Sequence, residues 1–211
     1  MSTLSVNTIQ EVTSANGVSV DGVTIKDGQV PASAGSSLVL LNTTTISSGV
    51  AGVIFDNSLI TTTYNAYKII FQGLSSDGAD FDLEAKFSND NGSNFINYKS
   101  ASQNTGLNVT ADGWAHDISN HSIFVDGEGT ATLSGGGGEL DVVIANDVAV
   151  VDVYGKSWGC VLNDNGTQYY SYFTTGISTT NSSDRVNYIR IHDLTGNNID
   201  AGKISLYGYK L

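Results

Sequence analysis

Residues 81–87, Phe81-Asp82-Leu83-Glu84-Ala85-Lys86-Phe87, alternate strictly between apolar and polar side chains. A period of two predicts a β-strand with one buried and one exposed face. Short runs rich in Val, Ile, Thr, Tyr and Phe recur between clusters of Gly, Asn, Asp and Ser, whereas helical periodicity is almost absent. The clearest of these runs cover residues 67–72, 140–144, 148–154, 158–162, 169–174, 188–191 and 203–209. We therefore predict an all-β chain whose main domain has about nine or ten strands, arranged as a β-sandwich or jelly roll.

Two glycine-containing stretches match sequence motifs, and we interpret both as connections between strands. Gly155-Lys156-Ser157-Trp158-Gly159 fits the bare G-x-S-x-G pattern of a hydrolase nucleophile elbow, but an apparent strand follows it where that motif requires a helix. Ser134-Gly135-Gly136-Gly137-Gly138-Glu139 has neither the Lys nor the helix that follow a phosphate-binding loop. We predict a hairpin turn at the first stretch and a flexible loop at the second.

The composition excludes several classes of partner. The chain has 211 residues, with 21 Asp and Glu against 9 Lys and Arg, so its formal net charge is −12. Such a surface repels phosphate groups, which argues against nucleic acid and against an anionic membrane. No apolar run approaches the roughly 20 residues of a membrane helix, and the first residues lack the pattern of a signal peptide. The single cysteine, Cys160, cannot form an internal disulfide, and we interpret it as a small buried residue.

The N-terminal 36 residues differ from the rest of the chain. Residues 17–28 contain two Val/Ile runs, each closed by Asp-Gly, which favours tight turns and predicts a strand–turn–strand unit. The apolar positions of this unit are Val18, Val20, Val23 and Ile25. So few apolar side chains cannot bury a core, so the unit must pack on the main domain, on copies of itself or on another protein. Pro31 lies in a small, polar stretch typical of a linker. We predict an attachment and oligomerisation segment at residues 1–36 and a β-sandwich head domain at residues 37–211.

The same N-terminal residues carry a resemblance to a known family. Leu4-Ser5-Val6-Asn7-Thr8-Ile9-Gln10, followed by Asn16-Gly17-Val18-Ser19-Val20-Asp21-Gly22-Val23-Thr24-Ile25-Lys26-Asp27-Gly28, resembles the repeated segments of tailed-phage virion proteins, which are common in tail fibres. The C-terminal run from residue 204 to residue 210 also resembles the closing strand of β-rich head domains in such proteins. The resemblance implies a homotrimer whose N-terminal part attaches to the particle and whose C-terminal part faces outward. Long fibres carry many such units and this chain has one, so a short appendage, a spike or a capsid-surface protein also fits.

The sequence offers no convincing catalytic, cofactor or metal site. The motifs H-E-x-x-H, G-x-x-x-x-G-K-[ST] and C-x-x-C are missing. His116 and Asp117 are adjacent, so within a strand they would point to opposite faces and could not share a proton. The same parity argument separates His116 from His121 as zinc ligands if they share one strand. The Asp/Asn-rich stretches at residues 75–82 and 89–94 leave a bound Ca²⁺ open, but turns between strands are the more common explanation of such stretches.

The most plausible binding surface in the sequence is aromatic. Within Tyr169-Tyr170-Ser171-Tyr172-Phe173, alternation places Tyr170 and Tyr172 on one face. If they face solvent, these two rings form a candidate surface for a sugar or a protein partner, together with Asn163, Asp164 and Asn165. We favour the other arrangement, in which both faces of this strand are covered, one by the core and one by a neighbouring subunit.

From the sequence we expect a non-enzymatic structural protein of a phage particle. The resemblance favours a tail-fibre-like or receptor-binding appendage subunit that binds a host-surface glycan or protein. It would be a homotrimer that contacts other virion proteins through residues 1–36, with no cofactor. A capsid or tail decoration protein anchored by the same segment is the first alternative. A polysaccharide-degrading hydrolase of the tailspike type is a remote one, because such enzymes build their groove on longer chains.

Overall fold

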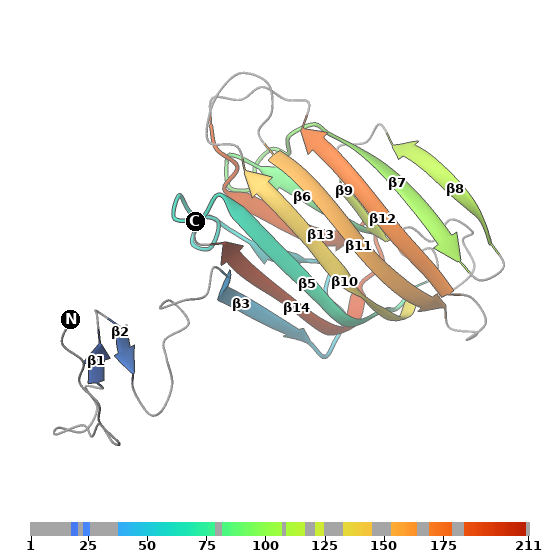
Figure 1. Cartoon of the computed structure of the whole chain (residues 1–211). Coiled ribbons are helices and arrows are strands. Elements are labelled where there is room, and N and C mark those ends of the chain that lie inside the picture. The colour runs from blue at the N-terminus through green and yellow to red at the C-terminus, as the bar shows by residue number, and fades with distance from the viewer. Residues whose placement is uncertain are drawn as a thin grey trace, which may run out of the picture.

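The computed structural model describes residues 18–20, 23–25, 38–78, 82–106, 109–116, 121–124, 133–144, 153–163, 169–178 and 184–209. In this part of the chain the regular elements are all strands. From residue 38 onward they form two antiparallel sheets, the smaller lying behind the larger in the view of Figure 1. The predicted all-β class is confirmed, and the two sheets are those of a β-sandwich head.

The larger sheet contains strands from both ends of the head. From edge to edge its order is β3 (Leu38–Ile46), β14 (Ile199–Tyr209), β5 (Ala66–Ser76), β10 (Leu133–Ile144), β11 (Val153–Asn163), β12 (Tyr169–Ser178), β7 (Tyr98–Gly106) and β8 (Val109–His116). The smaller sheet has the order β4 (Val53–Phe55), β13 (Tyr188–Asp193), β6 (Leu83–Ser88) and β9 (His121–Phe124). The described residues of the head therefore form twelve strands, more than the nine or ten expected. The short strands β4 and β9 carry too few residues to show an alternation.

The hydrophobic core lies between the two sheets. Strand β6 supplies the apolar residues of the alternating stretch at residues 81–87. Strand β13 supplies Ile189 and Ile191, which lie opposite Phe87 and Ala85. The larger sheet contributes the inward side chains of β5, β10 and β14. Together these buried residues include Tyr67, Ile69, Phe71, Leu83, Ala85, Phe87, Leu140, Val142, Ile189, Ile191, Ile204 and Leu206. Each large one removes enough apolar surface from water to stabilise the fold by about 1.5–3 kcal/mol.

Two connections expected from the sequence are strands in the structure. Strand β11 runs without interruption through Gly155–Gly159, so the predicted hairpin turn is wrong. Strand β10 includes the glycine run at residues 134–138, so the predicted loop is wrong as well. The glycine run pairs with β11 at close range, because a Cβ built on Gly138 would lie 2.6 Å from the Gly159 Cα atom. Glycine is a strand residue here because two backbones approach closely.

The N-terminal unit is described by its backbone. Strands β1 (Val18–Val20) and β2 (Val23–Ile25) pair antiparallel, with residue 18 opposite residue 25 and residue 20 opposite residue 23. The two predicted strands are therefore present and paired, and the predicted turn between them lies outside the described residues. The side chains of Val18, Val20, Val23 and Ile25 also lie outside the described residues, as does the predicted linker around Pro31. The boundary between an attachment segment and a head stays a prediction.

Candidate functional site

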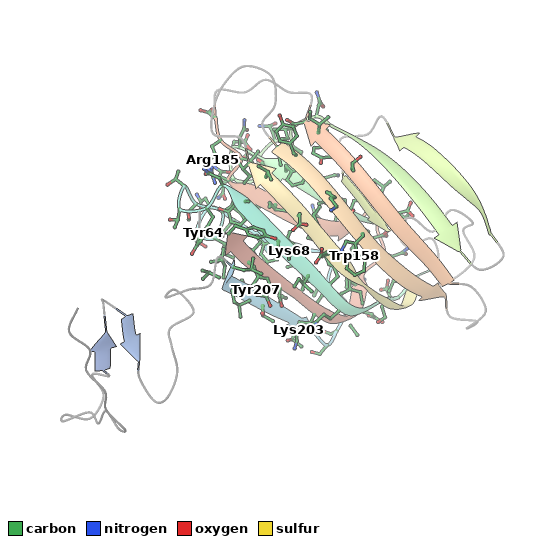
Figure 2. All side chains as sticks on the ribbon, in the orientation of Figure 1. Tyr64, Lys68, Trp158, Arg185, Lys203 and Tyr207 are labelled. Carbon is green, nitrogen blue, oxygen red and sulfur yellow. The ribbon has the colours of Figure 1, made fainter. Side chains whose placement is uncertain are left out.

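The outer face of the larger sheet is the main candidate for a functional surface. Its strands turn one set of side chains toward the core and the alternate set away from the smaller sheet. In the described residues no further strand lies over this outer face (Figure 1). Figure 2 shows Lys68, Trp158 and Tyr207 on the side of the sheet turned toward the viewer. We call the outward side chains of β5, β10, β11, β12 and β14 the outer face.

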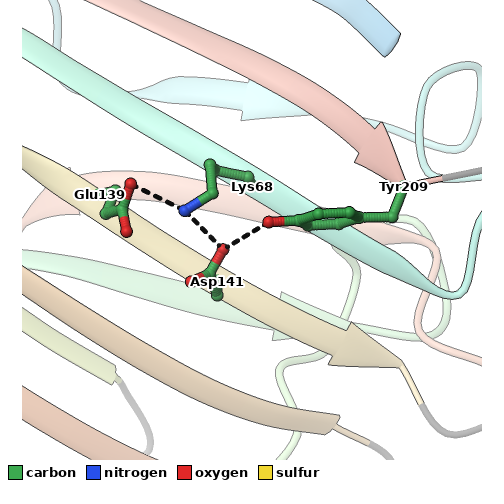
Figure 3. Close-up of polar contacts among 4 residues, drawn as sticks. All are labelled: Lys68, Glu139, Asp141 and Tyr209. Carbon is green, nitrogen blue, oxygen red and sulfur yellow. Dashed lines mark hydrogen bonds and ion pairs between the residues drawn. The ribbon is translucent and has the colours of Figure 1, made fainter. Parts of the chain in front are cut away.

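A network of charged groups occupies the middle of the outer face. The Lys68 Nζ atom lies 2.7 Å from Glu139 Oε2 and 2.9 Å from Asp141 Oδ1. The Tyr209 hydroxyl donates a hydrogen bond of 3.2 Å to the same Asp141 oxygen (Figure 3). Three adjacent strands, β14, β5 and β10, supply these groups, since Lys68 lies opposite Asp141 in the register and also opposite Tyr207. The network joins the strands through side chains as well as through the backbone.

The largest aromatic side chain of this face, Trp158, lies next to the network. Trp158 of β11 lies directly opposite Glu139 of β10. Its indole N–H acts on the Glu139 carboxylate and helps to lower the pKa of that group. The side chain is nevertheless 48% exposed. The indole therefore lies beside the network while much of it faces solvent.

An apolar strip crosses one end of the same face. Val143 of β10, Tyr154 of β11 and Ile177 of β12 are direct cross-strand neighbours. Their exposed fractions are 47%, 46% and 38%. Apolar side chains that are exposed together on adjacent strands are typical of an interaction surface. The outer face therefore combines an apolar strip, a charged network and an oriented indole.

The protonation states on this face suit binding better than catalysis. Burial raises the pKa of Glu139, but the hydrogen bonds from Lys68 and Trp158 outweigh it, so the pKa is lowered overall. A general acid of a glycosidase needs the opposite shift. Burial lowers the pKa of Lys68, but the hydrogen bonds to Glu139 and Asp141 outweigh it, so the pKa is raised. Lys68 therefore keeps its proton and has no lone pair to act as a nucleophile.

The residues predicted as a binding surface are placed only in part. Tyr170 and Tyr172 lie in β12, where they pair with residues 161 and 159 of β11. Asn163 is the last residue of β11 and pairs with Leu133. The side chains of these three residues, and Asp164 and Asn165 entirely, lie outside the described residues. The structure therefore leaves this predicted surface untested, and the sequence reasoning missed Trp158 and the network beside it.

A signal for the missed site was present in the sequence. From residue 153 to residue 159, small residues alternate with large ones, and the large set is Tyr154, Lys156 and Trp158. The structure buries the small set, including Gly155 and Ser157, and exposes the large set. Because this stretch was interpreted as a hairpin turn, the alternation was not recognised. It is the reverse of the usual pattern, since the bulky side chains face outward.

Two carboxylates of the acidic loops accept hydrogen bonds, Asp90 from its own turn and Asp77 from a segment distant in the sequence. Asp77 accepts hydrogen bonds from the backbone and side-chain nitrogens of Asn198, both 2.8 Å long. Asp90 accepts from the Ser88 hydroxyl and from both nitrogens of Asn94, which lowers its pKa to about 2. These bonds shape the turns in the way that Asp and Asn commonly do. Across the described ranges, no group of three or more His, Cys, Asp or Glu side chains is placed to hold a metal ion.

The histidines lie apart from the outer face. His116 ends β8 in the larger sheet, and His121 begins β9 in the smaller one, so the two belong to different strands. Asp117, the other residue of the superficial triad, lies outside the described residues. His192 is buried in β13 with its Nδ1 atom 2.7 Å from the Asp193 carbonyl oxygen, and burial lowers its pKa. A buried, neutral ring of this kind is a structural residue.

The comparisons with known proteins add no relative to this geometry. No protein-family model, curated protein or solved structure matches the chain. In the part of the chain that the structure describes, no helix is long and apolar enough to cross a membrane.

Proposed function

We propose that the chain is a non-enzymatic subunit of a phage particle, most simply a fibre-like appendage whose head binds the host surface. The observation that carries this proposal is the outer face, on which an exposed indole and an apolar strip surround a fixed ionic network. Large exposed aromatic and apolar groups on a rigid sheet are typical of a recognition surface. The protonation states of Lys68 and Glu139 give this face no obvious catalytic acid or nucleophile.

The N-terminal unit supports the virion context of the proposal. Its sequence resembles phage appendage segments, and its backbone forms the two-stranded ladder β1–β2. A ladder of three residues per strand is too small to be stable alone, so it needs a partner. We propose that residues 1–36 bind other virion proteins and associate with copies of themselves, as a homotrimer by the resemblance. Multivalent heads would then bind a surface more tightly than one head does.

A decoration protein of the capsid or tail is the second candidate. The observation that favours it is the single N-terminal unit, since a long shaft would need many. In that case the same segment anchors each head to the particle, and the outer face contacts a neighbouring virion protein.

Three measurements test the proposal. The first compares the solution mass of the full chain with that of a chain starting at Ser37, by light scattering. A trimer that dissociates without residues 1–36 supports the appendage, and a full-length monomer favours decoration. The second measures whether an excess of the full chain blocks adsorption of the encoding phage to its host. Antibodies against the head that fail to label the particles would refute the virion assignment itself.

A further inference from the structure

We propose that the outer face around Trp158 binds a neutral carbohydrate, with the indole as the stacking surface. This inference rests on the proposed adhesive function and names the class of ligand and the residues that hold it. It assigns the site to strands β5, β10 and β11, and not to Tyr170 and Tyr172 of β12, which the sequence analysis named as a candidate surface.

The first argument is the state of Trp158. A tryptophan in a strand gains most by burying its ring, yet this one is about half exposed. The indole lies opposite Glu139 in the register, and Lys68 holds Glu139 at 2.7 Å, so the network borders the ring on one side without covering it. An aromatic ring that is already oriented loses little conformational entropy when a ligand stacks on it. The faces of pyranose rings carry C–H groups that pack on such a ring, while their hydroxyls need polar partners.

The second argument is the space beside the indole. The outward position of β10 that precedes Glu139 is Gly137, which has no side chain. Among the atoms that the structure describes, a Cβ atom there would meet the Phe71 carbonyl oxygen at an ordinary 3.4 Å, and one at Gly135 would meet nothing within 4 Å. Packing therefore requires glycine at neither position, although glycine within a strand costs about 0.5–1 kcal/mol relative to alanine. Glycine in a strand also marks places where a ligand approaches the backbone.

The third argument is the balance of charge at the site. On the described parts of these three strands, two lysines, Lys68 and Lys156, face two carboxylates, Glu139 and Asp141, so the charges of the site sum to zero. The net charge of −12 disfavours polyanionic ligands at longer range. Gln72 and Lys203 are cross-strand neighbours with exposed side chains at the rim, next to Gly137 in the register. A neutral ligand rich in hydroxyls matches the Gln72 amide and the Lys203 ammonium at the rim, beside carboxylates that Lys68 already contacts.

The experiment uses the full chain labelled with ¹⁵N and follows the indole N–H signals of its two tryptophans, Trp114 and Trp158. The Trp158→Phe variant identifies which signal belongs to Trp158. Methyl glycosides of glucose, galactose, mannose and N-acetylglucosamine, together with dextran, are the neutral probes, and galacturonic acid is the charged comparison. We expect the Trp158 signal to move with at least one neutral probe while the Trp114 signal stays in place.

Three variants locate the site. Trp158→Ala should weaken binding of the responding probe about tenfold, the equivalent of about 1.4 kcal/mol. Gly137→Val should weaken it to a similar extent because it fills the space, while thermal unfolding shows that the fold is intact. Thr175→Val changes an exposed side chain of β12 on the same face and is the matched control, for which we expect unchanged binding.

The outcomes separate this inference from the proposed function. No movement of the Trp158 signal with any neutral probe overturns the carbohydrate site, as does a response to galacturonic acid alone. Broadening of that signal with protein concentration also overturns it, because a second copy then covers the face. If the chain still blocks phage adsorption in these cases, adhesion stands and its ligand lies elsewhere. If the carbohydrate binds but adsorption is not blocked, the site stands and the adhesive function fails.

Discussion

Replacing Gly138 by alanine should destabilise the head, whereas the same change at Gly137 should not. A Cβ atom at Gly138 would lie 2.6 Å from the Gly159 Cα atom and closer still to the Trp158 carbonyl oxygen. Both are backbone atoms of β11, so no side chain can rotate to make room. The two strands must separate in the middle of a ladder that pairs residues 136–144 with residues 153–161.

The magnitude follows from the cost of overpacking, which is about 1–3 kcal/mol when the surroundings adjust and more when they cannot. Because only backbone atoms obstruct the Gly138 methyl group, we expect about 3 kcal/mol. For a chain of this size that lowers Tm by about 6–12 °C. Gly137→Ala meets one atom at 3.4 Å and reduces the freedom of the unfolded chain, so it should raise stability by about 0.5 kcal/mol.

Thermal and urea unfolding of the full chain, followed by circular dichroism, measure both variants against the unsubstituted protein. The difference between the two alanines is the informative quantity, because helix and strand propensity change equally in both. Equal stability of Gly138→Ala and Gly137→Ala would refute the reasoning. It would mean that β10 and β11 do not approach each other as closely at residue 138 as the structure shows.

Three further predictions concern other parts of the head. Lys68→Met should lower the free energy of unfolding by about 1 kcal/mol near pH 7, since a partly exposed ion pair contributes little. The pKa of Glu139 is lowered in the folded protein, so this contribution is present above pH 4.5 and is lost as the pH falls. Urea unfolding across pH 3–7 measures it. The Asn94 amide should remain protected from hydrogen exchange at pH 3.5 and lose protection as the pH falls through about 2, where Asp90 takes up its proton. Phe87→Ala should cost about 3–5 kcal/mol in urea unfolding, because the ring is fully buried with its centroid 5.1 Å from that of Tyr98.

The fold class was predictable because strands with a buried and an exposed face alternate apolar and polar residues in the sequence. The stretch at residues 81–87 alternates in sequence, and in the described part of it Leu83, Ala85 and Phe87 point into the core. The polar residue Glu84 is buried as well, so this strand is less exposed than its alternation predicts. Sheet order was not predictable, since it depends on pairings between distant segments. Strand β14 lies between β3 and β5, which are more than a hundred residues earlier in the chain, and no local pattern encodes that.

The candidate site was missed for a different physical reason. Glycine was interpreted as a turn residue at residues 134–138 and 155–159, although in both places it lets backbones pair closely within the sheet. Composition alone cannot distinguish these two uses of glycine, because both exploit the missing Cβ atom. Once the stretches are recognised as strands, the outward positions of Glu139 and Trp158 follow from the alternation.

The position of β14 has a consequence for how the protein is made. The first strand of the head, β3, has only β14 as its partner in the sheet, and β5 needs β14 on one side. During synthesis, β3 and one edge of β5 therefore stay unpaired until residues 199–209 have left the ribosome. Exposed strand edges of this kind favour aggregation. A chain that terminates before residue 199 lacks the strand that joins β3 to β5, so we expect it to fail to form the larger sheet.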